Sequence, residues 1–74
     1  MDVIILDCVG MRCPMPIVQL GRAAQNARPG TQIEVTSDDA AFYSDVCTWA
    51  EIRGCKMELL ETENESHVRV RVIL

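Results

Sequence analysis

Hydrophobic and polar residues alternate along the first half of the chain in patterns that predict a strand, a helix and a second strand. The β-branched run 3–6 predicts a short strand that leaves into a loop. From Pro14 the spacing becomes helical, with apolar residues recurring three or four apart: Ile17, Leu20, Ala24 and Ala27. The Arg-Pro-Gly sequence at 28–30 should end this helix, and the alternation over 31–36 predicts a strand with one wet face.

The second half predicts one further helix and a hairpin. A helix should run over 40–53, with its N-terminus capped by the side chains of 37–39 and its end at Gly54. Asp38 and Asp39 could instead contact a basic surface of a partner. Strands over 56–61 and 67–74 flank a polar turn at 62–66. In the last strand the valines should face inward and the arginines outward, opposite Glu34 or Glu58: Val68, Val70, Val72, Arg69 and Arg71.

The predicted order is β-α-β-α-β-β, which defines an α+β fold. Right-handed crossovers place both helices on one face of a four-stranded mixed sheet, so we expect a two-layer α/β sandwich. The 74 residues contain no repeat or linker, and we expect residues 1–74 to form one small domain.

Charge and composition narrow the classes of function. The net charge is −4, and the chain has one Trp, one Tyr and one Phe, so we expect no direct binding of nucleic acid. The apolar run at the N-terminus is too short for a signal peptide or a membrane span, which indicates a cytoplasmic protein. The four cysteines should then be free thiols, and we expect a monomer that meets its partners briefly.

The loop over 7–16 contains the candidate reactive residue, because Cys13 there directly precedes a proline that begins a helix. The N-terminal end of a helix favours an anion, and Arg12 adds a neighbouring positive charge, so a reactive thiolate is expected at Cys13. Gly10 frees the loop backbone, while Pro14 and Pro16 stiffen the side that faces the helix. The alternative is that Cys13 is a small buried hydrophobic residue at the start of a helix.

The remaining cysteines allow several interpretations. Cys8 could act as a resolving thiol that forms a disulfide with Cys13, or could pack at the end of the strand. Cys47 and Cys55 are more simply interpreted as packing residues, and their spacing is wrong for a four-cysteine zinc site. We therefore predict no metal and no cofactor, and interpret His67 as a surface residue.

The loop resembles the TusA/SirA group of small sulfur-carrier proteins, whose pattern is an Asp, a Gly and then Cys-Pro-x-Pro. The matching residues are Asp7, Gly10, Cys13, Pro14 and Pro16. Further positions also fall where such proteins usually have these residues: Pro29, Gly30, Asp38, Asp39, Asp45 and Trp49. The chain departs from the pattern at Ala40 and Cys47, where relatives often have proline.

The resemblance implies that Cys13 accepts sulfur as a persulfide and relays it to a second protein by half-reactions. It implies a sulfur donor of the cysteine desulfurase or rhodanese type, and an acceptor in tRNA thiolation, cofactor synthesis, sulfur oxidation or thiosulfate utilisation. A membrane transporter of sulfur compounds is a further partner it suggests. The alternative is a redox-sensing or regulatory module that binds proteins without transferring sulfur.

Overall fold

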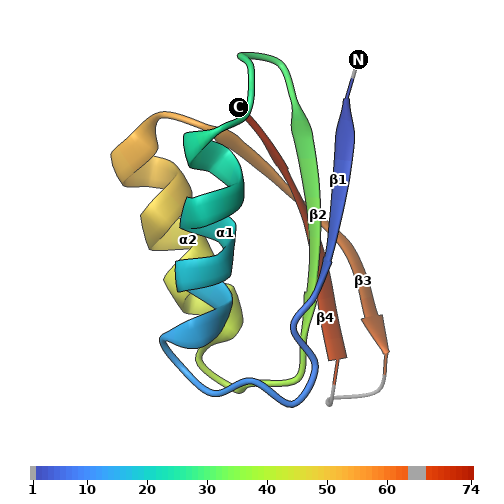
Figure 1. Cartoon of the computed structure of the whole chain (residues 1–74). Helices are drawn as coiled ribbons and strands as arrows, with labels where there is room; N and C mark the ends of the chain where they lie inside the picture. Colours follow the sequence, from blue (N-terminus) through green and yellow to red (C-terminus); the bar gives the residue numbers. More distant parts are fainter. Residues whose placement is uncertain (1, 64–66) are drawn as a thin grey trace.

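The protein forms two layers, a sheet and a pair of helices (Figure 1). The computed structural model describes residues 2–63 and 67–74. Along the chain the elements are β1 (Val3–Asp7), α1 (Met15–Gln25), β2 (Gln32–Ser37), α2 (Phe42–Arg53), β3 (Lys56–Glu63) and β4 (His67–Ile73). Neither helix has the length and apolar character needed to cross a bilayer.

The sheet has the strand order β1-β2-β4-β3. β1 pairs with β2 in parallel, whereas β4 is antiparallel to both β2 and β3, so the sheet is mixed. Both helices cover the same face of it (Figure 1). The predicted α+β two-layer sandwich is therefore confirmed. Because β1 and β2 are parallel, the loops that leave their C-terminal ends start at the same edge of the sheet.

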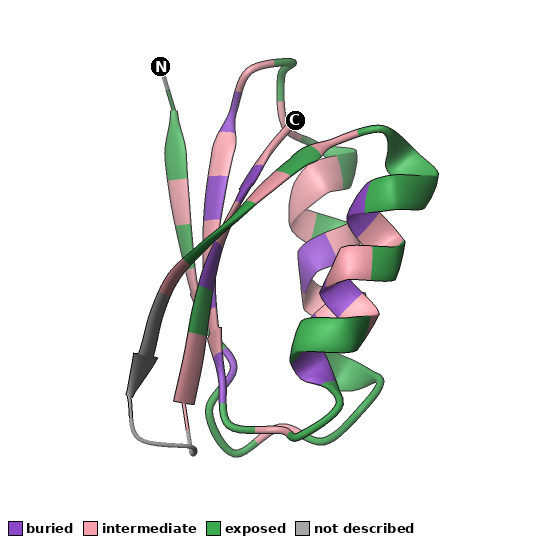
Figure 2. Cartoon of the chain, turned by 180° about the vertical axis from the view of Figure 1, so that it is seen from behind, coloured by how far each residue is buried: buried purple, intermediate pink, exposed green. Residues whose placement is uncertain are grey.

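The core lies between the sheet and the two helices (Figure 2). Alternate residues of β2 and β4 point into it, as the period of a strand requires. Leu20 of α1 and Phe42 and Val46 of α2 close it from the other side. The inward orientation predicted for Val70 and Val72 is confirmed, since both are fully buried, and Val68 packs partly buried against the same cluster.

The outer face of the sheet carries a row of ion pairs. Glu34 of β2 binds two arginines of β4, with 3.2 Å to Arg69 and 3.5 Å to Arg71. Arg71 also lies 3.5 Å from Glu58 of β3. The predicted pairing of outward arginines with Glu34 and Glu58 is confirmed, and it follows the register of three neighbouring strands on that face.

Predicted boundaries need correction in both helices and in the hairpin. α1 ends at Gln25 with Asn26 as its C-cap, so Ala27 lies beyond it. α2 begins at Phe42 with Ala41 as its N-cap and no side-chain capping bond, so the acidic pair 38–39 does not cap it. Its predicted end is confirmed, because Gly54 adopts the left-handed conformation there, with φ of 70°. Thr62 and Glu63 belong to β3 and not to the turn, while residues 64–66 of the predicted turn lie outside the described residues.

Candidate functional site

The loop from β1 to α1 is held in one shape by three hydrogen bonds. The Asp7 carboxylate accepts one from the Val9 N–H, at 3.1 Å, and the Cys8 carbonyl accepts one from the Met11 N–H, also at 3.1 Å. Gly10 has a φ of 89°, which glycine adopts without strain, and its N–H donates to Asp38 Oδ1 at 2.8 Å. Asp7 and Gly10 thus shape the loop that presents Cys13.

The first turn of α1 follows directly after Cys13. Pro14 is the N-cap, its carbonyl accepts from the Val18 N–H at 3.0 Å, and Pro16 is buried in the first turn. Cys13 therefore stands next to the N-cap, as expected. The Met15 N–H, however, donates to the Arg12 carbonyl at 2.8 Å, so this amide is not free to stabilise a thiolate.

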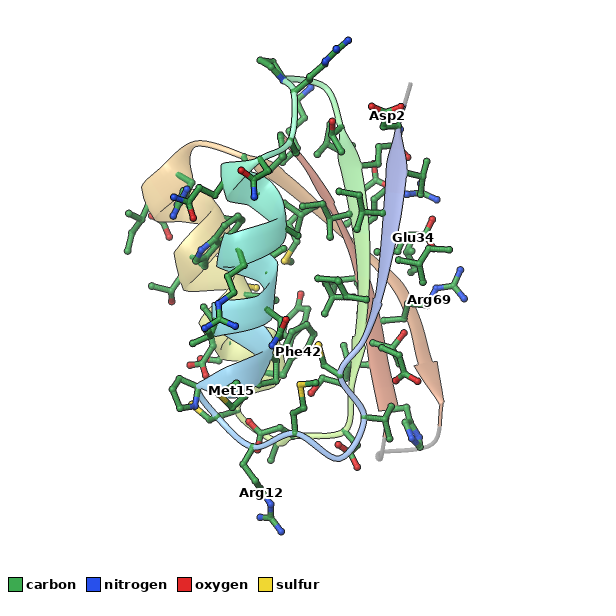
Figure 3. All side chains as sticks on the ribbon, viewed as in Figure 1. Asp2, Arg12, Met15, Glu34, Phe42 and Arg69 are labelled. Atoms are coloured by element: carbon green, nitrogen blue, oxygen red, sulfur yellow. The ribbon has the colours of Figure 1, made fainter. Side chains whose placement is uncertain are left out.

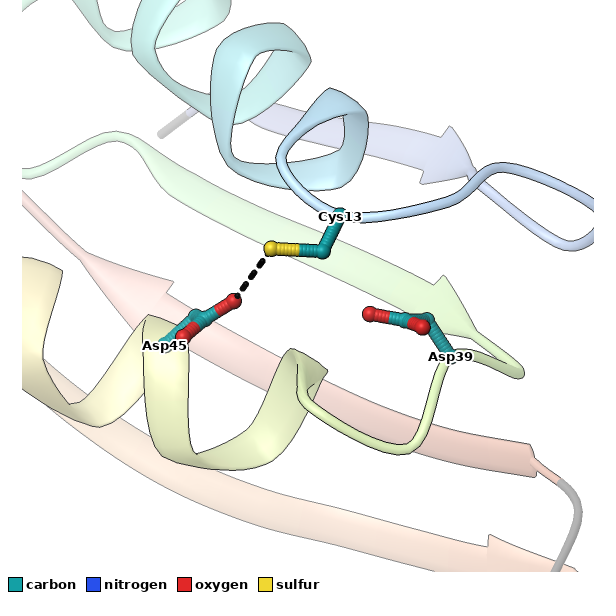
Figure 4. Close-up of side chains that lie close together, drawn as sticks. All are labelled: Cys13, Asp39 and Asp45. Carbon is teal, nitrogen blue, oxygen red and sulfur yellow. Dashed lines mark hydrogen bonds between the residues drawn. The ribbon is translucent and has the colours of Figure 1, made fainter.

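The Cys13 thiol is exposed and donates a hydrogen bond to Asp45 Oδ2, at 3.1 Å (Figure 4). Asp39 points toward the same sulfur from the loop before α2, and one atom from each of the three side chains lies within 4.8 Å of the other two. The hydrogen bond to Asp45 raises the pKa of Cys13, and partial desolvation and the charges of Asp45 and Asp39 raise it further. The surroundings of the sulfur therefore disfavour the thiolate that the sequence predicted at Cys13.

Arg12 does not supply the expected positive charge. Its side chain is exposed and extends away from the body of the protein (Figure 3). The charges that act on the Cys13 thiol are those of the two aspartates, and both disfavour the thiolate. Sequence adjacency to Cys13 therefore did not bring the guanidinium to the sulfur.

An apolar groove begins at Cys13 and runs between the two helices. Its volume is about 370 Å³, and its lining is contributed by both helices and the loop: Cys13, Pro14, Ile17, Asp45, Thr48, Trp49 and Ile52. Ile52 is 80% exposed. Arg53 stacks over the Trp49 ring, 5.0 Å from its centroid, on the same helix. The exposed thiol thus borders an apolar surface, with a carboxylate beside it.

The other cysteines lie apart from this groove. Cys8 is buried in the core, and burial raises its pKa, with a smaller contribution from Asp7. Cys47 of α2 packs against Met57, with 3.8 Å between the sulfurs, and Cys55 is half-buried against the core. The packing interpretation of Cys47 and Cys55 is confirmed. A resolving role for Cys8 would require its loop to open, and remains a prediction.

His67 lies outside this site. It begins β4, in register with Glu63 of β3, and is half-buried where the sequence predicted a surface residue. Among the described residues, the thiol of Cys13 and the carboxylates of Asp39 and Asp45 lie close enough together for all three to bind one cation. Exposed acidic groups also gather without a metal, so the cluster by itself assigns none.

The sequence does not predict that Asp39 and Asp45 lie beside the sulfur. It predicts Asp39 as a capping residue or as a contact for a partner's basic surface, and Asp45 only as a position shared with similar proteins. The signal that could have found them is topological: in a parallel β1–β2 pair, the loop after β2 and the first turn of α2 lie at the same edge as the loop after β1. Acidic residues in that loop and turn can therefore come close to Cys13, as Asp39 and Asp45 do.

Comparisons with known proteins agree with one another. A family model described as sulfurtransferase TusA matches residues 4–73. The putative sulfur carrier protein YrkI of Bacillus subtilis is 33% identical over 64 residues, which cover 86% of this chain and 83% of YrkI. The putative sulfur carrier protein YrkF of the same organism is 34% identical over 65 residues, 88% of this chain but only 34% of YrkF.

The fold has a solved counterpart. The crystal structure of the SirA-like protein from Desulfitobacterium hafniense superposes with a TM-score of 0.82 at 27% identity, covering 95% of both chains. The family model spans nearly the whole chain, and YrkI matches it over most of both lengths. This chain belongs to the TusA family.

Proposed function

We propose that this protein is a sulfur carrier that accepts sulfane sulfur as a persulfide on Cys13 and passes it to a second protein. The observation that carries the proposal is the exposed Cys13 thiol at the mouth of an apolar groove. The loop is held by hydrogen bonds on both sides of Gly10, so the sulfur is offered in a defined position. The names of its relatives, two of them putative sulfur carriers, support the same role.

The transfer consists of two thiol–disulfide-type exchanges. The Cys13 thiol loses its proton, and the thiolate attacks the outer sulfur of the donor's persulfide. The donor's S–S bond breaks, its electron pair stays on the inner sulfur, and that sulfur takes up a proton as a thiol. An acceptor thiolate then attacks the outer sulfur on Cys13 in the same way, which restores the Cys13 thiol with no net oxidation.

The half-reactions require a protein on each side. The donor would be a cysteine desulfurase or a rhodanese-type protein, and the acceptor a protein of tRNA thiolation, cofactor synthesis, sulfur oxidation or thiosulfate utilisation, a membrane transporter among them. The apolar groove beside Cys13 suits brief docking, since its lining includes Ile17, Trp49 and the exposed Ile52. A carrier of this kind needs a protein surface at each step and no cofactor of its own.

Intact mass spectrometry tests the proposal. The protein is incubated with a persulfidated cysteine desulfurase, and its mass is measured before and after addition of an acceptor thiol. We expect a gain of one sulfur atom that is lost in Cys13→Ser and retained in Cys47→Ser, a matched change at a half-buried thiol. The added sulfur should leave when the acceptor thiol is supplied.

Two results would contradict it. Absence of any sulfur gain on the wild-type chain would leave the redox-sensing or regulatory module as the better interpretation. A gain that persists in Cys13→Ser would move the carrier site to another cysteine.

A further inference from the structure

The strand β1 forms one edge of the sheet, and half of its backbone groups face away from β2 (Figure 1). Directly after β1, the Cys8 N–H donates to the Thr36 carbonyl at 2.8 Å. In a parallel pair, a residue that bonds the neighbouring strand uses both its N–H and its C=O, and the next residue faces the other way. Counting back from Cys8, the residues whose N–H and C=O groups face the open edge are Val3, Ile5 and Asp7.

The same alternate residues of β1 also carry its exposed side chains. Val3 is 51% and Ile5 75% exposed, and exposed and half-buried residues alternate along the strand (Figure 2). A strand added at this edge would pair with the outward N–H and C=O groups and would cover these two apolar side chains from one side. The edge thus offers both hydrogen bonds and apolar surface to an extended segment.

The two edge strands of the sheet differ in their protection against such pairing. β3, at the other edge, carries the exposed charges of Lys56 and Glu58 and has an irregular register between Leu59 and Glu61. Charged side chains and bulges are devices by which edge strands avoid pairing with further strands. Within Val3–Asp7 the register with β2 is unbroken, and the strand has neither a basic residue nor a proline. β1 is therefore the edge that can accept a further strand.

The charges at the two ends of this edge indicate which kind of strand it suits. Exposed carboxylates lie at both ends, those of Asp2 and Asp7, and neither forms an ion pair with another described residue. Arg28 borders a hollow together with Asp2 but is not paired with it. A second copy in antiparallel pairing would bring Asp2 of one chain beside Asp7 of the other at both ends, which like-charge repulsion disfavours. A strand with basic ends would be attracted instead.

We propose that β1 accepts a strand from a partner protein, an extended segment of alternating apolar residues with a Lys or Arg near each end. The inference goes beyond the proposed function, since it concerns the edge of the sheet and not the sulfur or the groove. A strand of 5 residues buries far less than the roughly 1,200–2,000 Å² of a stable interface, so this docking would be brief. The loop that carries Cys13 begins where β1 ends, so a docked strand would hold the partner beside that loop (Figure 1).

NMR titration with a synthetic peptide tests the proposal. The probe is acetyl-Lys-Val-Thr-Val-Thr-Val-Lys-amide, and its matched counterpart carries Glu at both ends. With the basic peptide, the amide signals of Val3, Ile5 and Asp7 should shift, and their exchange with water should slow by about twofold at half-saturation. The amides of Ile4 and Leu6 already face β2 and should change much less. The acidic peptide should bind on the order of tenfold more weakly at low ionic strength.

Two variants of Ile5 make the test specific to this edge. Ile5→Pro removes the central outward N–H without removing a bond to β2, and should weaken binding of the basic peptide by about fivefold. Ile5→Lys keeps that N–H but places a positive charge on the edge, so it should also weaken binding, and it keeps the test valid if the proline variant folds poorly. The control is Leu59→Lys, at a half-exposed leucine of β3, which should bind the peptide as the wild type does.

Three results would overturn the proposal. The first is an absence of shifts at the amides of Val3, Ile5 and Asp7 with millimolar basic peptide, and the second is equal binding of the acidic peptide. The third is a shift of the same amides with protein concentration alone, which would make a second copy the occupant. The assay uses no sulfur donor, so its failure is distinguishable from failure of the carrier function: a chain that gains sulfur on Cys13 but does not bind the peptide is a carrier without this docking edge.

Discussion

Cys13 and Asp45 are 32 residues apart in the sequence, yet Cys13 Sγ donates a hydrogen bond to Asp45 Oδ2 at 3.1 Å. The bond joins the loop before α1 to the first turn of α2, across the mouth of the groove. It exists only while the thiol is protonated. The relationship therefore sets how readily the sulfur ionises.

Replacement of Asp45 by Asn should lower the pKa of Cys13. In the wild-type chain the hydrogen bond to Asp45 and the charge of Asp45 favour the thiol over the thiolate and so raise the pKa of Cys13. Without that carboxylate, the pH profile of Cys13 alkylation by iodoacetamide should shift to lower pH, and alkylation near pH 7 should become faster. Glu51→Gln, an exposed change on the same helix, serves as the control. A profile unmoved in Asp45→Asn would contradict this account.

Asp38 should hold the loop that presents Cys13. Its Oδ1 accepts the Gly10 N–H at 2.8 Å, so Asp38→Ala leaves that amide without this acceptor, whereas Asp38→Asn keeps an oxygen in place. We expect Asp38→Ala to lower the free energy of unfolding by about 1 kcal/mol and to speed hydrogen exchange of the Gly10 amide. Asp38→Asn should remain close to wild type in both quantities. Urea unfolding measures the free energy, and NMR measures the exchange rate of the Gly10 amide. Equal exchange rates in the two variants would argue against a role of Asp38 in holding the loop.

The same substitution at two isoleucines should separate core from surface. Ile33 is fully buried, whereas Ile5 is 75% exposed on the opposite face of the sheet. Ile33→Val removes one buried methylene and should cost about 0.5–1.5 kcal/mol of unfolding free energy, because the close-packed core relaxes only partly. Ile5→Val should change it by less than about 0.5 kcal/mol. Urea midpoints measure both, and equal losses would mean that the outer face is covered in solution.

Two glycines should respond to alanine with opposite signs. Gly54 has a φ of 70°, which an L-residue adopts at a cost, so Gly54→Ala should destabilise the protein by about 1 kcal/mol although nothing blocks the added methyl.

Gly21 lies within α1, and its added Cβ would meet only the Trp49 ring nitrogen, at 4.0 Å. Gly21→Ala should stabilise by about 0.5–1 kcal/mol through helix propensity. Thermal unfolding of the two variants checks the signs, and a destabilised Gly21→Ala would show that the two helices pack more tightly there than this contact implies.

Local sequence patterns were sufficient to predict the helices and strands and the face that each strand buries. The alternation of Val68, Val70 and Val72 with Arg69 and Arg71 predicted both the inward face and the ion pairs to Glu34 and Glu58, because side chains in a strand alternate regardless of what surrounds them. Gly54 marked the end of α2 for an equally local reason, its tolerance of positive φ. The end of the first helix was less well predicted: the helical spacing included Ala27, whereas α1 ends at Gln25.

The ionisation of the Cys13 thiol could not be predicted from its neighbours in the sequence. From the sequence, Cys13 next to Arg12 and a proline-led helix indicated a thiolate, since only neighbours along the chain could be weighed. In the folded protein Arg12 extends outward, the Met15 amide is bonded to Arg12, and carboxylates from the next loop and helix reach the sulfur instead.

Local sequence patterns were enough to predict which cysteine lies at the start of a helix, the order of helices and strands along the chain, and the residues of the core, because propensity and periodicity act between near neighbours. The electrostatic surroundings of that cysteine depend on the folded arrangement. A charge acts through space, and the parallel pairing of β1 with β2 brings Asp39 and Asp45 to Cys13 from more than twenty residues away.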